Sequence, residues 1–301
     1  KYYVPQRAAA GLDPWATPQA YDNAKDFFDT GITWSNSLNV AQMLDKSSYS
    51  ISLGNTHQDG IISSTGMDRY NVKVSADTKL TNNWSSGFTA NYITTSIDKA
   101  VTSGNGLLRT VYAAPPSYDL AGIPSHVDGN PYTQNSFRGS FDNAYWAMEN
   151  NKFTEDTNRF FGNVYASYQT DFGTTNHKLN AKYMVGVDAY TTHYVDSYGY
   201  GSNTGGGRGQ IENYGWTNAT YNSLLTINYD WHINEDWGLN AVVGNEIIQS
   251  NRKKYYEYGT NYNFPGWNHI NNATTQQTEE ETWKNRSSRS VRDRHRCCYH
   301  I

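Results

Sequence analysis

The fold is decided by the stretch Tyr70-Asn71-Val72-Lys73-Val74-Ser75-Ala76-Asp77-Thr78-Lys79-Leu80, in which apolar and polar residues alternate. The side chains of a β-strand point alternately to the two faces of its sheet. One face therefore reads Tyr, Val, Val, Ala, Thr, Leu, and the other reads Asn, Lys, Ser, Asp, Lys. A strand of about ten residues with one apolar and one polar face suits a wall between lipid and a water-filled lumen.

The composition favours an all-β chain over an ordinary soluble core. Hydrophobic residues make up only 37% of the 301 residues and mean hydropathy is -0.77, yet aromatic residues reach 15% and Tyr occurs 25 times. Disordered chains are poor in aromatic residues, so we expect this chain to fold. A polar, Tyr-rich chain with alternating segments is typical of β-structure. The net charge of -4, without charged blocks over most of the length, gives no indication of a nucleic-acid partner.

Hydropathy alone gives little information about membrane insertion. The sequence contains no run of 18 apolar residues, so it predicts no transmembrane helix. A barrel strand shows only every second residue to lipid, so an average over neighbouring residues misses it. The chain begins at Lys1 and shows no signal peptide, which we interpret as a missing N-terminal region.

Two kinds of connection join the alternating segments. After a loop at 1–32 with a short helix within 22–29, strands are expected at about 33–41, 47–56, 69–80, 85–97, 158–170, 177–189, 222–233 and 237–258, with another beginning near Trp283. Short turns are expected at 42–46, 81–84, 171–176 and 234–236, and long loops at 98–157, 190–220 and 259–282. Short turns on one rim and long loops on the other predict an antiparallel up-and-down outer-membrane β-barrel. Trp84, Phe172 and Trp237 lie beside the short turns, where an interfacial aromatic girdle is expected.

The tail Arg286–Ile301 differs from the barrel segment at 1–285. It holds five of the twelve arginines, both cysteines and no strand pattern. Adjacent Cys297 and Cys298, even with His295 and His300 nearby, do not have the usual spacing of zinc ligands. A basic nucleic-acid-binding tail is a second alternative. The abrupt change of composition favours an atypical tail produced by a shifted reading frame.

Several stretches resemble the SusC/RagA family of TonB-linked outer-membrane transporters. The resemblance covers residues 20 to 285 and is carried by Asp22-Asn23-Ala24-Lys25-Asp26-Phe27-Phe28-Asp29-Thr30-Gly31, by Tyr49-Ser50-Ile51-Ser52-Leu53-Gly54, by Gln58-Asp59-Gly60-Ile61-Ile62 with Arg69-Tyr70-Asn71, and by Asn158-Arg159-Phe160-Phe161-Gly162-Asn163. The first resembles the entry to that family's barrel, the next two an early hairpin, and the last a strand that follows a long external loop.

This resemblance implies a barrel of about 22 strands with an N-terminal plug inside it. It also implies a TonB-contacting segment before the plug, a SusD-like lipoprotein lid, and uptake of oligosaccharides or peptides through the outer membrane of a Gram-negative, Bacteroidetes-type bacterium. Plug, TonB-contacting segment and more than half of the strands are absent from the sequence. We therefore expect a fragment of about eight or nine strands that depends on the missing N-terminal region to reach TonB.

No enzyme signature is present, since GxSxG, HExxH and the P-loop are all missing. We expect no catalysis, no cofactor and no metal. Flat rings with a polar tip suit contact with sugars or with a partner surface, although rings can also pack loops against one another. The candidates for ligand or lid contact are Tyr112, Tyr118, Tyr132, Trp146, Tyr198, Tyr200, Trp216, Tyr262 and Trp267. The candidates for lining the lumen are Asn71, Lys73, Asp77, Asn180, Lys182 and Asp188.

Two functions remain open at this point. The first is a segment of a SusC-like TonB-dependent receptor that acts by binding and gating. The second is a soluble, secreted all-β glycan-binding module, which would bury its apolar faces between two sheets. A β-sandwich hydrolase would need a nucleophile or an acid pair, and none can be named. The receptor requires that the apolar rows face lipid and that the lysines face solvent: Tyr70, Val72, Val74, Leu179, Tyr183 and Val187 outward, Lys73 and Lys182 inward.

Overall fold

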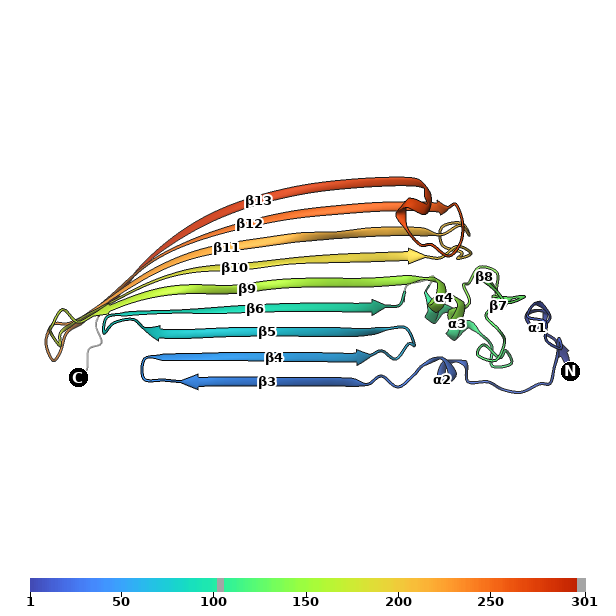
Figure 1. Cartoon of the computed structure of the whole chain (residues 1–301), viewed down its shortest axis with the longest axis horizontal. Helices are drawn as coiled ribbons and strands as arrows, with labels where there is room; N and C mark the ends of the chain where they lie inside the picture. Colours follow the sequence, from blue (N-terminus) through green and yellow to red (C-terminus); the bar gives the residue numbers. More distant parts are fainter. Residues whose placement is uncertain (102–105, 297–301) are drawn as a thin grey trace.

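The alternating segments form one antiparallel sheet of nine long strands (Figure 1). The computed structural model describes residues 1–101 and 106–296. The nine strands are β3 (Thr33–Met43), β4 (Ser47–Asp59), β5 (Gly66–Lys79), β6 (Trp84–Lys99), β9 (Lys152–Thr170), β10 (His177–Tyr198), β11 (Gln210–His232), β12 (Gly238–Tyr262) and β13 (Ala273–Arg296). Each strand pairs with its neighbours in chain order, so the sheet is a simple meander, as predicted.

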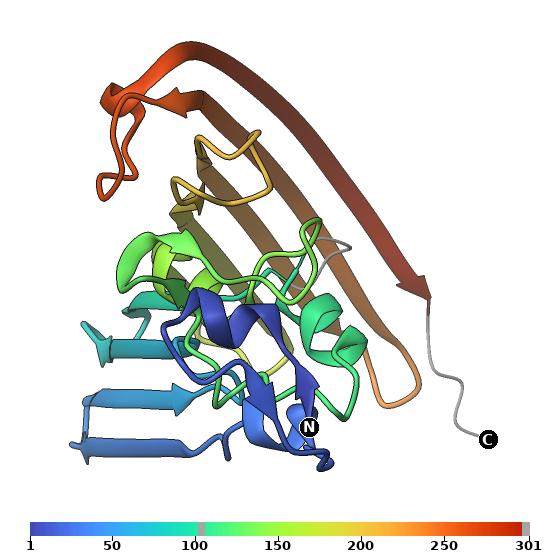
Figure 2. The same ribbon diagram turned by 90° about the vertical axis from the view of Figure 1, so that its right-hand side faces the viewer.

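The short elements all lie at the loop end of the sheet. They are β1 (Tyr2–Tyr3), α1 (Pro5–Ala9), β2 (Trp15–Ala16), α2 (Asn23–Phe27), α3 (Leu107–Ala113), β7 (His126–Val127), β8 (Asn130–Gln134), α4 (Ala144–Asn150) and η1 (Ile270–Asn272). Figure 1 shows the N-terminal segment and the segment between β6 and β9 side by side at this end, and Figure 2 views the sheet from there. The expected short helix within 22–29 is confirmed as α2, whose N-cap Asp22 accepts a hydrogen bond from the Lys25 backbone N–H.

The strands are longer, and the loops shorter, than the sequence pattern predicts. β10 continues to Tyr198 instead of ending near 189, and β11 begins at Gln210 instead of 222. The three long connections therefore shrink to 100–151, 199–209 and 263–272. The physical reason is that the backbone ladder does not require alternation. Near the loop end both faces of the sheet carry polar and aromatic residues, so the periodic signal ends before the hydrogen bonds do.

The same correction applies to the C-terminal tail. Residues 286–296 show no strand pattern, yet they continue β13, which pairs with β12 as far as Arg296. Lys284 and Arg286 are thereby placed in register with Asn251 and Gln249. Cys297, Cys298 and His300 lie outside the described residues. The origin of this tail in a shifted reading frame stays a prediction.

The main hydrophobic core lies outside the sheet, under the loops. Residues from the N-terminal segment, the 60–65 hairpin and the 100–151 loop share one buried cluster: Val4, Phe27, Ile62, Leu107, Val111, Tyr118, Leu120, Ile123, Ala144, Trp146 and Ala147. A second, smaller cluster joins Ile211, Tyr262 and Ala273. The loop end is thus a folded cap, which positions the surfaces described next.

Candidate functional site

The apolar side chains of the sheet share one face, and that face is exposed. Val72 pairs with Leu53 on β4 and with Tyr92 on β6, and Tyr92 pairs with Phe160 on β9. Residues directly opposite in an antiparallel ladder lie on the same face. Val72 is 41% exposed and Tyr183, in the same apolar set, is 48% exposed. In the described part of the chain, no second layer covers this face, which we call the outer face, so a sandwich is not formed.

Aromatic side chains bound the apolar band of the outer face. Near the short turns, Trp84 packs against Tyr168 with ring centroids 5.0 Å apart. The expected girdle residues Trp84, Phe172 and Trp237 are all exposed at this rim. Tyr168 and Phe160 are eight positions apart on β9, which corresponds to about 27 Å of strand. That length matches the apolar band of roughly 25 Å in outer-membrane barrels.

Polar pairs replace the apolar side chains beyond this band, toward the loops. His57 Nδ1 lies 2.8 Å from Asp68 Oδ1, and the Ser96 hydroxyl donates to Asp156 Oδ1 at 2.6 Å. On each strand, these residues are an even number of positions from the apolar residues of the band. They therefore lie on the outer face. The outer face thus changes from apolar to polar side chains between the band and the loops.

The opposite face, which we call the inner face, is polar and hollowed. Lys73 pairs with Asn91, Asn91 with Phe161, and Phe161 with Asp188, so this row crosses four strands on one face. A groove of about 700 Å³ lies along it. All six candidates for lining the lumen are on this face, from β5 (Asn71, Lys73, Asp77) and from β10 (Asn180, Lys182, Asp188).

Two of these candidates meet through a residue that the sequence analysis did not single out. The Tyr165 hydroxyl donates to Asp77 Oδ1 at 2.6 Å, across Gly87 on the intervening strand. Lys182 Nζ lies 4.1 Å from the centre of the same ring. An ammonium group over an aromatic face is attracted by its quadrupole. Tyr165 therefore joins an anion and a cation of the inner face.

A second ionic contact fixes Asp188. Arg159 donates from Nε at 2.9 Å and from Nη2 at 2.6 Å to the two carboxylate oxygens. The planar guanidinium group suits such a bidentate pair. The Arg159 guanidinium also lies 4.8 Å from the centre of the Phe161 ring. This pair links β9 to β10 in the middle of the inner face.

Three of the loop aromatic candidates are buried in the cap and offer no surface to a ligand. Trp146 and Tyr262 are fully buried, and Trp146 Nε1 donates to the Pro131 carbonyl at 2.9 Å. Tyr118 is buried with its hydroxyl unpaired, and burial, with a further contribution from Asp119, raises the pKa of Tyr118 to about 12. We therefore withdraw these three residues from the set of proposed contacts.

The other six aromatic candidates are accessible. Tyr112 is 68% exposed, and Trp267 stacks on Phe264 and His269 at the end of the 263–272 loop. The remaining four are partly buried: Tyr132, Tyr198, Tyr200 and Trp216. Tyr198 and Trp216 belong to strands β10 and β11 and not to a loop.

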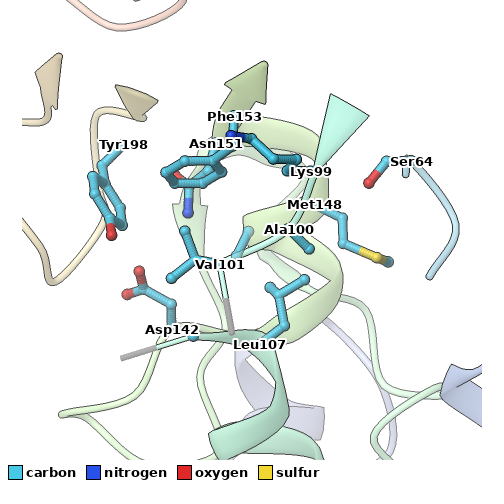
Figure 3. Close-up of a pocket in the computed structure, with 12 residues that line it drawn as sticks. Ser64, Lys99, Ala100, Val101, Leu107, Asp142, Met148, Asn151, Phe153 and Tyr198 are labelled. Atoms are coloured by element: carbon cyan, nitrogen blue, oxygen red, sulfur yellow. The ribbon is translucent and has the colours of Figure 1, made fainter. Parts of the chain in front are cut away.

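One carboxylate connects the two loops that lie over the inner face. Asp142, in the 100–151 loop, accepts hydrogen bonds from the Ser202 hydroxyl at 2.6 Å and from the Asn203 backbone N–H at 2.8 Å. Gln134 also donates to Asp142 at 2.8 Å. Asp142 lines a small pocket with Tyr198 and with residues of α3 and α4 (Figure 3). The contact holds the 100–151 and 199–209 loops together.

The inner-face aromatic residues near the loops were not among the residues predicted for a site, because 190–220 was expected to be a loop. Tyr194 and Tyr214 pair across β10 and β11, and their rings stack at 4.8 Å. A signal was present: aromatic or polar residues continue at every second position from Tyr190 to Tyr198. Extending the alternation past Ala189 would have placed these rings on the polar face.

Other site types are not formed by the described residues. No group of three His, Cys, Asp or Glu side chains arranged for a metal ion occurs within 1–101 and 106–296. Within the same ranges, no helix has the length and apolar character to cross a membrane.

Solved structures with the same arrangement of strands identify the fold. Chains of the RagAB peptide transporter superpose with a TM-score of 0.69 at 14% sequence identity, covering 90% of this chain and 30% of theirs. Chains of the RagAB peptide importer in its closed-closed and open-open states give TM-scores of 0.67 and 0.68 at 16% and 14% identity, each covering 92% of this chain and 32% of theirs. The chain has an antiparallel β fold like that of part of these β-barrel chains. No family model matches the sequence, and no curated protein matches it.

The structural similarity covers only part of the RagAB chains. The chain spans about a third of the length of these RagAB chains. At this level of identity it establishes the fold alone. The neighbours are transporters and not enzymes. Activity, substrate and partners are therefore matters for the proposal that follows.

Proposed function

We propose that the chain is a wall segment, with its external cap, of a SusC-like TonB-dependent transporter in a bacterial outer membrane. One observation carries the proposal: a single sheet has an exposed apolar band on one face and a hollowed polar surface on the other. Among the residues that the structure describes, the edge strands β3 and β13 of this open sheet have no further partner, and lipid does not tolerate unpaired edges. We infer that further strands of the same barrel pair with them.

The mechanism follows from the two faces. The apolar band would hold the wall in the bilayer, while the inner face would line a hydrated path. The ligand would be a peptide or an oligosaccharide, and a SusD-like lipoprotein would cover the loop end. The RagAB neighbours are peptide importers, which supports a peptide over an oligosaccharide as the ligand. Energy from TonB would act through regions outside this chain, and the outer membrane of a Bacteroidetes-type bacterium is the proposed location.

Expression of the whole gene and separation of the membranes tests the proposal. We expect the protein in the outer-membrane fraction, extracted only by detergent, and we expect uptake of a fluorescent peptide or oligosaccharide to stop when TonB is deleted. A monodisperse protein in the soluble fraction would contradict the proposal and favour the secreted glycan-binding module. Uptake that continues at the same rate without TonB would contradict the transport mechanism.

A further inference from the structure

Aromatic side chains form a continuous row on the inner face just below the loops. Tyr194 pairs with Tyr214, and Tyr214 with Tyr256, so the row crosses β10, β11 and β12. The Tyr194 and Tyr214 rings are nearly parallel, at 6°, and the Trp216 ring lies 5.5 Å from that of Tyr194. All four side chains are only partly buried. We call Tyr194, Tyr214, Trp216 and Tyr256 the aromatic wall.

Cationic groups of the protein itself already contact this wall. Lys99 Nζ lies 4.6 Å from the centre of the Tyr194 ring, and the Arg252 guanidinium lies 5.2 Å from that of Trp216. Such contacts are favourable because the face of an aromatic ring carries negative partial charge. The chemistry of the wall therefore suits ammonium and guanidinium groups.

The charges beside the wall favour the same groups. Asp196 and Glu212 lie directly opposite each other in the β10–β11 ladder. Like charges in this arrangement repel and destabilise a sheet. Asp196 accepts a hydrogen bond from the Tyr214 hydroxyl at 3.0 Å, but among the described residues neither carboxylate is in an ion pair. Among the nearby cations, Lys99 is paired with Glu155 at 3.3 Å, and Lys254, opposite Trp216 on β12, is also opposite Glu281 on β13.

We propose that the aromatic wall, with Asp196 and Glu212, is a docking surface for peptides that carry lysine or arginine side chains. The argument is charge complementarity. A cationic side chain would relieve the repulsion between the two carboxylates and place its alkyl stem along the rings. A neutral oligosaccharide would stack on the rings without relieving that repulsion, and an acidic peptide would increase it. This inference rests on the proposed function, because it assumes that ligands enter the lumen from the loop end.

Binding measurements on the full-length protein in detergent test the inference. The probes are two hexapeptides, one alternating alanine with lysine and one alternating alanine with glutamate, and maltohexaose. We expect the lysine peptide to bind at least about tenfold more tightly than the other two, a difference equivalent to about 1.4 kcal/mol. The double variant Asp196→Asn/Glu212→Gln should lose this preference, and Trp216→Leu should weaken binding of the lysine peptide severalfold.

The matched control removes two carboxylates from the outer face at the same height. Asp98 and Glu257 lie on the outer face, an even number of positions along their strands from its apolar residues. The double variant Asp98→Asn/Glu257→Gln should therefore leave the preference for the lysine peptide unchanged. Equal binding of the two peptides by the parent protein would overturn the inference. So would a preference that survives the inner-face double variant, or maltohexaose as the tightest ligand.

The two proposals fail in different ways. Membrane fractionation, as described above, tests the transporter and does not depend on the identity of the ligand. A protein that resides in the outer membrane but shows no preference for the lysine peptide overturns this inference alone. A protein that stays soluble overturns the proposed function, whatever it binds.

Discussion

Tyr165 and Asp77 form a hydrogen bond of 2.6 Å although their strands, β9 and β5, are not neighbours. The residue between them in register is Gly87 on β6. Because glycine has no side chain, the phenol can extend over the intervening strand to the carboxylate. The contact couples three strands on the inner face, and several expectations can be tested around it.

Gly87→Ala should destabilise the sheet. A Cβ at Gly87 would collide with the Asp77 carboxylate and approach the Tyr165 ring to 2.8 Å. Overpacking of this kind costs about 1–3 kcal/mol. Urea unfolding followed by tryptophan fluorescence measures the change. Gly244→Ala is the matched control on the same face, because its Cβ would meet only the Leu225 carbonyl at 3.7 Å. Equal stability of the two variants would contradict the steric account.

Tyr165→Phe should cost less than Gly87→Ala. It removes the hydrogen bond to Asp77 but keeps the ring under Lys182. The contact is partly hydrated, so we expect a loss of about 1 kcal/mol or less in the free energy of unfolding. In an Asp77→Asn background the same substitution should cost still less. If Tyr165→Phe lowers the free energy of unfolding by the same amount in the Asp77→Asn background, the hydroxyl of Tyr165 stabilises the protein through a partner other than Asp77.

Tyr118→Phe should leave the cap as stable as before, or slightly more stable. The Tyr118 hydroxyl is buried with no partner among the described residues, and an unpaired buried hydroxyl is costly. Trp146→Ala, in the same cluster, should instead cost about 3–5 kcal/mol, because it leaves a large cavity. Limited proteolysis of the 100–151 loop measures both. Faster cleavage of Tyr118→Phe than of the parent protein would show that the Tyr118 hydroxyl stabilises the cap, which would contradict its description as unpaired.

The same tyrosine predicts a loss of stability at high pH. Burial raises the pKa of Tyr118 from 10 to about 12 in the folded protein. Between these values the unfolded chain loses the proton and the folded one keeps it, so the contribution of Tyr118 to stability is intact below pH 10 and falls as the pH rises toward 12. The difference in ultraviolet absorbance between the parent and Tyr118→Phe should show only about a tenth of the full phenolate signal at pH 11. A titration centred on pH 10 would contradict burial.

Asp142→Ala should separate the two loops over the inner face. The Ser202 hydroxyl and the Asn203 backbone N–H would lose their acceptor. Hydrogen exchange should then rise severalfold in 199–209 while the strands stay protected. Asp128→Asn, in the same long loop but outside this contact, is the control, because asparagine tolerates the left-handed backbone found at Asp128. Unchanged exchange in Asp142→Ala would show that the loops are held by other contacts.

The parts of the strands that lie within the apolar band could be predicted from the sequence. The parts of the same strands nearer the loops could not. At Tyr70–Leu80 most positions of the outer face are apolar and those of the inner face are polar, so periodicity is strong. Above the band, at Tyr194 or Trp216, both faces meet water or the cap, and nothing enforces alternation. The burial of Trp146 depends on contacts with the N-terminal segment and α3, which no local pattern encodes. The position of Asp142 between two loops is equally non-local.

The most direct test of the central claim is the environment of the two faces of β5 and β10 in a bilayer. Single cysteines would replace Val72, Val187, Lys73 and Lys182 in the full-length protein, after Cys297 and Cys298 are changed to Ser, and each would carry a nitroxide spin label. We predict that labels at Val72 and Val187 collide mainly with oxygen dissolved in lipid, and that labels at Lys73 and Lys182 collide mainly with a water-soluble nickel chelate. The same collision ratio at all four positions, or the reverse pattern, would contradict the account.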